Sequence, residues 1–241
     1  NEFGGLCRLL GRFELAEAYL QRALRIRQAQ KESSPASYAR VLNNLSLVKQ
    51  AVGERREALR LIQESYQLFL KMYGPTHAET VVPRMNLAQA HSSLGELEQA
   101  EQLYSEALAV ARSQYGADSL EVATVLHNLG TLMLEMSDLE KAKLYLEQAL
   151  ATRRHRLSSN HPDLGPTLIN LATTHRKAGR YDQALELYRE ALSVGQAALG
   201  QDHPDLAYTL DLMAGVPSLA TKPDEVLELT RRAYEIRRKA F

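Results

Sequence analysis

Several kinds of residue and segment are missing, or nearly missing, from this sequence of 241 residues. The only cysteine is Cys7, so the chain cannot form an internal disulfide, and an oxidising compartment is not implied. No run approaches the roughly 18 consecutive apolar residues that a membrane-spanning helix needs, and no basic-then-apolar signal segment opens the sequence. Lys plus Arg number 29 and Asp plus Glu number 29, so the positive surplus that binds nucleic-acid phosphates is lacking. We therefore expect a cytoplasmic protein that neither inserts into a membrane nor binds nucleic acid.

Signatures of catalysis are missing as well. The sequence has no Gly-rich phosphate loop, no nucleophile elbow and no HExxH motif. Its 7 histidines are scattered or recur with a repeat, and no tight Cys/His cluster suits a metal ion. Cys7 is interpreted as a core residue rather than a nucleophile. We expect no enzymatic activity, no cofactor and no metal.

The dominant feature of the sequence is an internal repeat with a period of about 42 residues. Its clearest marks are an Asn-Leu pair, a glycine and an alanine, each recurring at that spacing. The asparagines are Asn44, Asn86, Asn128 and Asn170, the glycines are Gly53, Gly95 and Gly179 with Ser137 in the third copy, and the alanines are Ala58, Ala100, Ala142 and Ala184. So many columns at one spacing indicate that each copy is one structural unit.

Each copy is interpreted as two consecutive α-helices. Apolar residues in its first half recur at helical spacing, as at Val125, Leu129 and Leu132. The glycine ends this helix, because glycine adopts the left-handed cap conformation at low cost, and the second helix follows at once. The alanine of the second helix lets the two helices approach to about 8–10 Å. One hairpin cannot bury its apolar stripe alone, so neighbouring hairpins are expected to bury it jointly.

Prolines indicate where the first helices begin. Pro162 and Pro204 are each followed by Asp, and we expect them to open a helix, because the N–H that proline lacks is unpaired there. Pro83 and Pro166 fall inside or near the start of their first helices, and they predict a late start or a kink.

The repeating columns resemble the tetratricopeptide repeat, in which an alanine follows the turn glycine by five residues and another follows seven later, as at Gly95, Ala100 and Ala107. The usual unit has about 34 residues, and the 42-residue version resembles the kinesin light chain type. The strings 42–45 (LNNL), 200–207 (GQDHPDLA) and 23–27 (ALRIR) look like its signature. The resemblance covers the whole chain. It implies an all-α fold, a right-handed superhelical α-solenoid of ten or eleven helices in antiparallel pairs, without a sheet.

We predict one array over residues 1–241: a partial repeat at 1–32, full repeats at 33–74, 75–116, 117–158 and 159–200, and a degenerate capping repeat at 201–241. In the last repeat Leu212 replaces the Asn, Pro217 falls inside the first helix and Thr221 replaces the turn glycine. Phe3 falls in the column of Leu45, so the chain is expected to be a fragment of a longer array.

The resemblance implies that the first helices line a concave groove, which binds a peptide segment of a partner in an adaptor or scaffold role. Its predicted lining is the Asn column with its neighbours one turn away: Arg40, Asn43, Asn44, Met85, Asn86, Gln89, His127, Asn128, Thr131, Asn170, Thr173, Arg176 and Lys177. An Asn side chain offers a carbonyl acceptor and two N–H donors, so it can pair with a peptide backbone. Because each Asn precedes a core leucine, we expect it to be partly exposed.

Two alternatives stay open at this point. Each Asn could instead bond a neighbouring repeat and set the stacking. The whole array could also be structural or autoregulatory, with its groove occupied intramolecularly or by self-association. The oligomeric state and the identity of the partner are not determined by the sequence.

Basic residues slightly outnumber acidic residues near the predicted groove. Arg40, Arg84, Arg176 and Lys177 outnumber Glu135 and Asp211, and His91, His127 and His175 would add positive charge below neutral pH. This pattern predicts either an acidic partner or an ordinary solvated surface. Arg84 stands in a column of leucines, so it is expected to reach the groove edge or to mark a local rearrangement. The run 153–156 (RRHR) lies near a second-helix end, where cations suit the helix dipole.

Overall fold

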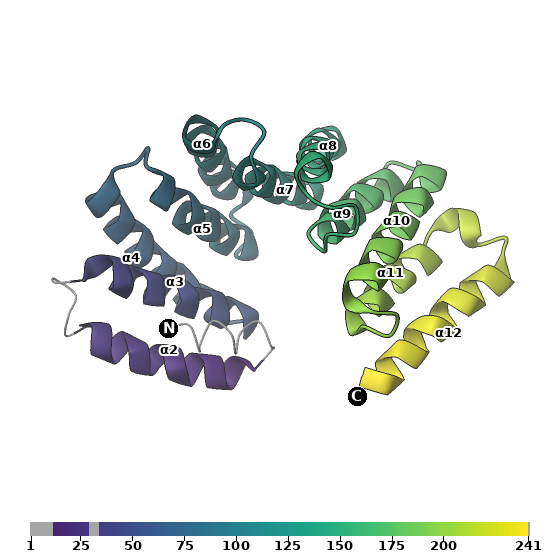
Figure 1. Cartoon of the computed structure of the whole chain (residues 1–241), viewed down its shortest axis with the longest axis horizontal. Coiled ribbons are helices and arrows are strands. Elements are labelled where there is room, and N and C mark those ends of the chain that lie inside the picture. The colour runs from purple at the N-terminus through teal and green to yellow at the C-terminus, as the bar shows by residue number, and fades with distance from the viewer. Residues whose placement is uncertain (1–11, 29–33, 241) are drawn as a thin grey trace. The chain divides into compact units, whose positions relative to one another are not determined.

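The computed structural model describes residues 12–28 and 34–240, and the regular secondary structure of these ranges is entirely helical (Figure 1). Its eleven α-helices and two 3-10 helices are α2 (Phe13–Gln28), α3 (Pro35–Ala51), α4 (Arg55–Tyr73), η1 (Ala78–Thr80), α5 (Val81–Ser93), α6 (Leu97–Tyr115), α7 (Leu120–Glu135), α8 (Leu139–Arg156), α9 (Leu164–Lys177), α10 (Tyr181–Leu199), α11 (Pro204–Ala214), η2 (Pro217–Leu219) and α12 (Pro223–Ala240). The predicted all-α fold of ten or eleven helices is confirmed for this part of the chain. The predictions made for Phe3 and Cys7 lie outside the described residues.

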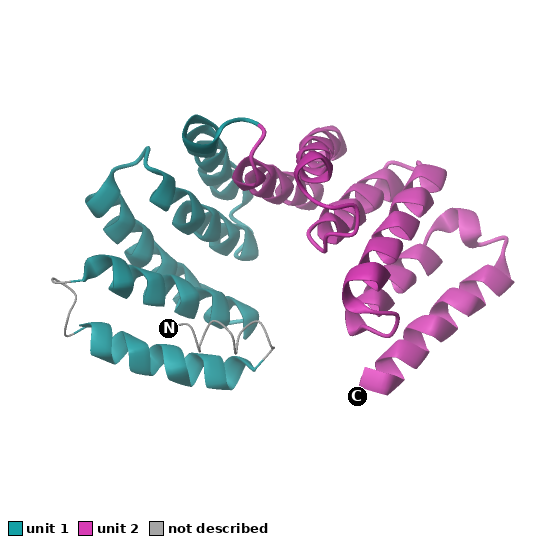
Figure 2. Cartoon of the chain, in the orientation of Figure 1, with its two compact units in different colours: residues 1–117 teal, residues 118–241 magenta. Residues whose placement is uncertain are grey.

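The chain divides into two compact units, residues 1–117 and residues 118–241 (Figure 2). In the first unit α3 packs along α4, α5 packs along α6, and α2 packs against α3. In the second unit the pairs are α7 with α8, α9 with α10, and α11 with α12. Each pair is an antiparallel hairpin joined by a short turn. We call α3, α5, α7, α9 and α11 the first helices and their partners the second helices.

The turn within the hairpin has the same backbone geometry in four consecutive repeats. Gly53, Gly95 and Gly179 have φ angles of 86°, 82° and 76°, in the left-handed region that glycine adopts without steric cost. Ser137 takes φ 63° at the corresponding turn, although a side chain disfavours that conformation. The packing of α7 on α8 therefore imposes the turn that glycine favours in the other hairpins.

The alanine column lies where the two helices of a hairpin meet, and Ala58, Ala100, Ala142 and Ala184 are all buried. The two helices also approach closely in the third hairpin, where a Cβ atom added to Gly130 of α7 would lie 2.5 Å from Cγ of Leu146 on α8. The predicted role of these alanines as core spacers is confirmed.

Two first helices begin later than the repeat predicts. Pro83 is the third residue of α5 and Pro166 is the third residue of α9, so each proline lies among the first four residues, whose N–H groups have no acceptor within the helix. An earlier start would place the proline ring against a helical carbonyl. The prediction that Pro162 opens α9 is therefore wrong, because Pro166 delays the helix. Pro204 does open α11, as predicted.

A repeated histidine caps the segment that leads into three first helices. Nδ1 of His77, His161 and His203 accepts the backbone N–H two residues later, at 3.2 Å, 3.2 Å and 3.3 Å. The recurrence of these histidines is thus explained by a local turn rather than by a metal site.

The last repeat departs from the others, but not as predicted. Helix α11 ends at Ala214, so Pro217 does not lie inside it and instead begins the short helix η2. Val216 and Leu219 are buried and join Ala184 and Tyr188 in one apolar cluster. Gly215 and Pro217 favour termination of the helix. The short helix η2 then supplies the apolar side chains that a further turn of α11 would have contributed.

Candidate functional site

The Asn column lies on consecutive first helices, with Asn44 on α3, Asn86 on α5, Asn128 on α7 and Asn170 on α9. All four side chains are partly exposed, whereas the leucine that follows each of them is buried. Successive helical residues are about 100° apart, so each Asn lies at the edge of the buried face. The predicted partial exposure is confirmed, whereas contact with a peptide stays a prediction.

In the first unit, a hydrogen bond between two side-chain amides links successive first helices. Nδ2 of Asn86 on α5 donates to Oδ1 of Asn43 on α3 at 2.8 Å. Nδ2 of Asn43 is 3.5 Å from Oδ1 of Asn44, a long and weak contact. The first of these bonds ties one repeat to the next.

In the second unit, Nδ2 of Asn170 donates to Oγ1 of Thr131 on α7 at 2.8 Å. The Thr131 hydroxyl donates in turn to the backbone carbonyl of His127 at 2.9 Å. Thr173, one turn beyond Asn170, bonds to the hydroxyl of Tyr188 at 2.8 Å. Asn170 and Thr131 therefore link α9 to α7, whereas Thr173 bonds to the second helix α10.

These bonds bear directly on the two roles open to the asparagines. Each inter-repeat bond uses one N–H of an amide that carries two N–H groups and one carbonyl oxygen. Asn86 and Asn170 therefore contribute to stacking and retain polar atoms on a partly exposed side chain. Stacking and peptide binding are compatible at these positions.

His127 is not the cationic groove residue that the sequence suggested. Burial, followed by the positive charge of Arg153, lowers the pKa of His127 to about 4, so the ring is neutral at mildly acidic pH. Arg153 can only donate, so Oγ1 of Thr167 accepts from its Nη1, and the Thr167 hydroxyl is free to donate to Nδ1 of His127 at 3.2 Å. Nη1 of Arg153 also donates to the carbonyl of Asp163 at 2.9 Å.

Arg153 is a residue whose place the sequence analysis missed. It was interpreted as one of several cations at a helix end, but its side chain is buried, between α7 and α9. Burial lowers the pKa of its guanidinium, and the negative charge of Asp163 raises it. The repeat pattern does not reveal this burial, because the same position holds Arg27 and Arg237 as well as Phe69, Ala111 and Gly195.

Arg84 also lies away from the predicted groove. It is 3% exposed, and its Nε donates to the hydroxyl of Tyr66 at 2.7 Å while Nη2 donates to the carbonyl of Pro75 at 2.8 Å. Its guanidinium carbon is 5.5 Å from the centre of the Tyr66 ring. The expectation that Arg84 reaches the groove edge is wrong, because buried acceptors from α4 and the following loop hold it inside.

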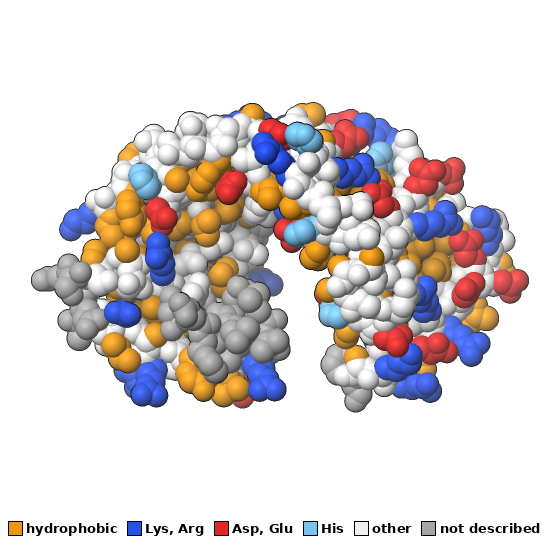
Figure 3. Space-filling view, in the orientation of Figure 1, with side chains coloured by type: hydrophobic (Ala, Val, Ile, Leu, Met, Phe, Trp, Pro, Cys, Tyr) orange, Lys and Arg blue, Asp and Glu red, His pale blue; other side chains and the backbone are white. Residues whose placement is uncertain are grey.

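The remaining predicted groove residues differ in what they present. Met85 is buried, whereas Gln89 and Lys177 are exposed and Arg176 is partly exposed. Arg40 is exposed but forms an ion pair with Glu79 at 3.2 Å. The basic surplus is therefore smaller than the sequence suggested. On the face shown in Figure 3, Lys and Arg side chains are interspersed with Asp and Glu, notably over α12.

Two hollows adjoin the first helices. One lies in the first unit between α3 and α5, has a volume of about 170 Å³, and is lined by residues that include Arg40 and Asn43. The other lies in the second unit between α9 and α11, has a volume of about 590 Å³, and is lined by residues that include Ile169 and Asn170. Predicted groove residues thus border both hollows.

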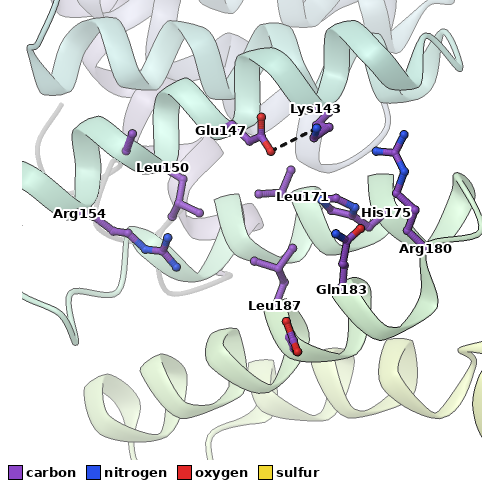
Figure 4. Close-up of a pocket in the computed structure, with 11 residues that line it drawn as sticks. Lys143, Glu147, Leu150, Arg154, Leu171, His175, Arg180, Gln183 and Leu187 are labelled. Atoms are coloured by element: carbon purple, nitrogen blue, oxygen red, sulfur yellow. Dashed lines mark ion pairs between the residues drawn. The ribbon is translucent and has the colours of Figure 1, made fainter.

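A different cavity, of about 750 Å³, lies among α8, α9 and α10 (Figure 4). Its cations have acidic partners: Arg154 binds Glu190 at 2.6 Å, Arg180 binds Glu140 at 3.2 Å, and Lys143 lies 3.7 Å from Glu147. His175 lines this cavity and is buried, and burial followed by the charges of Arg180 and Lys143 lowers its pKa. His175 therefore lies in a cavity other than the two hollows that the predicted groove residues border.

Other kinds of site find little support in the described ranges. In residues 12–28 and 34–240, no group of three or more His, Cys, Asp or Glu side chains is arranged to hold a metal ion. Among the described helices, none combines the length and the apolar character that a bilayer span requires.

The geometry defines a class of protein: a helical-hairpin repeat protein whose first helices present amide and hydroxyl side chains at recurring positions. A sequence model of the tetratricopeptide repeat matches residues 1–71, 37–113, 84–155 and 163–239. The chain belongs to the tetratricopeptide repeat family. No curated protein matches it in sequence.

Solved structures share this fold at low sequence identity. BtubC (BKLC) from P. vanneervenii is 21% identical, with a TM-score of 0.79 over 95% of this chain and 92% of that one. A kinesin light chain-like protein with nearly identical TPR-like repeats, from Podospora anserina, is 21% identical, with a TM-score of 0.69 over 85% and 97%. A Rap protein complexed with Competence and Sporulation Factor is 16% identical, with a TM-score of 0.71 over 98% and 73%. The predicted likeness to kinesin light chain-type repeats is confirmed at the level of the fold.

Proposed function

We propose that this chain is a protein-interaction module that binds an extended segment of a partner protein along its first helices, in an adaptor or scaffold role. The observation that carries the proposal is that a partly exposed Asn recurs on successive first helices of each unit, on α3 and α5 of the first and on α7 and α9 of the second. Amides that recur at one repeat position can pair with the main-chain N–H and C=O groups of an extended peptide whatever its sequence. No catalytic step is part of the proposal.

Two further findings support it. Tetratricopeptide repeats generally mediate protein–protein interactions, and the family matches most of this chain. The Rap protein that shares the fold was solved in complex with Competence and Sporulation Factor. Exposed Gln89 on α5 and exposed Lys177 on α9 add polar groups near the asparagines.

A purely structural role for the asparagines is the second candidate. It is favoured by the bonds of Asn86 to Asn43 and of Asn170 to Thr131, each of which links successive repeats. In a structural or autoregulatory array the groove would be filled by another part of the full protein or by a second copy.

The two candidates are separated by measuring binding and stability on the same variants. Peptides are selected on the wild-type chain from a random 12-residue library displayed on phage, and the affinity of labelled synthetic copies is measured by fluorescence anisotropy. Gln89→Ala and Asn86→Ala should each weaken binding about 2- to 13-fold, which corresponds to one hydrogen bond of about 0.5–1.5 kcal/mol. Gln99→Ala, at an exposed position of the second helix α6, is the matched control and should leave affinity unchanged.

The free energy of unfolding distinguishes further between a peptide-binding role and a structural role of the asparagines. Asn86→Ala should also lower the free energy of unfolding by roughly 0.5–1.5 kcal/mol, because the bond to Asn43 is lost, whereas exposed Gln89→Ala should not. If no peptide is enriched, or if Gln89→Ala, Asn86→Ala and Asn170→Ala all bind the selected peptides like wild type, the first helices are not the binding surface. The structural role then becomes the better account of the asparagines.

A further inference from the structure

The two hollows beside the first helices occupy the same place in the repeat. The hollow between α3 and α5 is lined by Phe69 and Glu79, and the hollow between α9 and α11 is lined by Gly195 and Asp205. Each residue of the second pair stands three repeats after its counterpart in the first. We call this position the inter-repeat niche: the space between two consecutive first helices, closed by the second helix that joins them.

In two repeats the chain fills this niche with one of its own side chains. Between α3 and α5 the ring of Phe69 is 3% exposed and leaves a hollow of about 170 Å³. Between α7 and α9 the same repeat position is Arg153, whose guanidinium binds the carbonyl of Asp163 and the hydroxyl of Thr167. The niche is thus a space that accepts one large side chain.

Between α9 and α11 the corresponding residue is Gly195, which has no side chain to place there. The hollow measures about 590 Å³, more than three times the volume of the niche that Phe69 fills. Two large apolar side chains that line it remain exposed to solvent, Leu199 at 43% and Tyr208 at 59%. Buried Leu206 and partly buried Ile169 complete an apolar lining.

The charges that line this open niche are of one sign. Asp163 and Asp205 are its charged residues, and their side chains are 64% and 80% exposed. Nδ1 of His161 lies 3.8 Å from Oδ2 of Asp163, and Nδ1 of His203 lies 3.7 Å from Oδ2 of Asp205. Each of these Nδ1 atoms accepts a backbone N–H. Arg153 interacts with Asp163 through its charge, which leaves Asp205 as the stronger attraction for a ligand cation.

We infer that the niche between α9 and α11 binds an aromatic or leucine side chain of a partner segment that carries Lys or Arg beside that anchor. The inference rests on the proposed function, because Asn170 borders the niche and would hold the main chain of the same segment. An aromatic or leucine anchor is inferred because the chain itself places the ring of Phe69 in the equivalent space. A Lys or Arg beside the anchor is inferred because the two aspartates that line the niche attract positive charge. This charge is opposite to the acidic partner that the sequence suggested.

The test uses the full chain and the random 12-residue phage library. Peptides enriched on wild type should share an aromatic residue or Leu with a Lys or Arg within two positions. Gly195→Phe, which places in this niche the ring that Phe69 places in the other, should weaken a selected labelled peptide at least tenfold. Ser193→Phe adds the same ring at an exposed position of α10 and serves as the matched control, with affinity unchanged.

A second variant controls for misfolding of Gly195→Phe, because a Cβ atom at position 195 would lie 2.7 Å from Cδ2 of Leu206. Asp205→Asn leaves the exposed position uncharged, and it should weaken the peptide about threefold and reduce the salt dependence of its affinity. Replacing the peptide's apolar anchor by Ser should abolish binding to wild type, and replacing its cation by Glu should weaken it more than Asp205→Asn does.

Failure of the niche and failure of the proposed function give different results. If selected peptides bind Gly195→Phe and Asp205→Asn like wild type but lose affinity for Gln89→Ala or Asn170→Ala, the niche inference is overturned and the proposed function stands. Enrichment of acidic peptides, or a dimer that Gly195→Phe dissociates in sedimentation, would also overturn the niche inference. If no peptide is enriched at all, both fall together.

Discussion

Arg84 and Tyr66 form a buried polar pair at a place where the other repeats use leucines. The repeat position of Arg84 otherwise holds Leu42, Leu126, Leu168 and Leu210. The repeat position of Tyr66 holds Leu24, Leu108, Leu150 and Leu192, and Tyr only once more, at Tyr234. Both partners are at most 7% exposed, and Nε of Arg84 donates to the Tyr66 hydroxyl at 2.7 Å. Replacing both by Leu therefore restores a combination that the chain already uses.

A double-mutant cycle measures how strongly the pair is coupled. Arg84→Leu leaves the Tyr66 hydroxyl without its donor, and Tyr66→Leu leaves a buried guanidinium without one acceptor, so each should lower the free energy of unfolding by about 2 kcal/mol or more. A hydrogen bond to a charged group contributes about 1.5–3 kcal/mol. The double variant should therefore cost less than the sum of the single variants by about that amount.

Urea unfolding followed by circular dichroism is the suitable assay, because the chain contains no Trp for fluorescence. Leu126→Val, at the same repeat position in another hairpin, is a control for altered packing and should show no coupling to Tyr66→Leu. Additive effects of Arg84→Leu and Tyr66→Leu would refute the reasoning, because they would mean that the buried bond contributes nothing beyond the packing of each side chain.

Two other predictions concern the second unit. Ala142→Leu should overpack the buried contact between α7 and α8 and cost about 1–3 kcal/mol; hydrogen exchange should show protection lost first in those two helices, and a uniform loss along the chain would contradict it. His127 has a folded pKa of about 4 against an ordinary value of 6.5, so its neutral form contributes stability above pH 6.5 that is lost as the pH falls toward 4. Between pH 7 and pH 4.5 the wild type should therefore lose about 2–3 kcal/mol more of its free energy of unfolding than His127→Gln loses, and parallel urea-unfolding profiles for the two proteins would show that the ring is not held neutral.

The repeat could be identified from the sequence alone because its signals are local. The turn glycines, the alanine spacers and the Asn-Leu pairs each report a requirement within one hairpin, and that requirement recurs from one repeat to the next. The helix count, the burial of Ala142 and the partial exposure of Asn86 follow from helical phase, which depends only on residue spacing. The late starts of α5 and α9 follow from Pro83 and Pro166 in the same way.

Contacts between repeats were not accessible to that reasoning. The sequence marks Arg84 as unusual, but only packing brings it to Tyr66, 18 residues earlier. It likewise places Arg153 at a helix end, whereas the structure buries it near His127 of the preceding helix, where burial and the charge of Arg153 keep the histidine neutral. Side chains of this length reach several neighbours, so their direction depends on which space the adjoining repeats leave open.

The same distinction between local signals and contacts between repeats applies to the candidate site. Which residues lie on the first helices is set by periodicity, and the Asn column could be named from it. Whether an asparagine is tied to the next repeat, and whether a niche is filled by Phe69, by Arg153 or left open at Gly195, depends on the volumes of side chains that come from three different helices. Local sequence sets the backbone positions of such a site, and the packing of neighbouring repeats decides what each position leaves for a ligand.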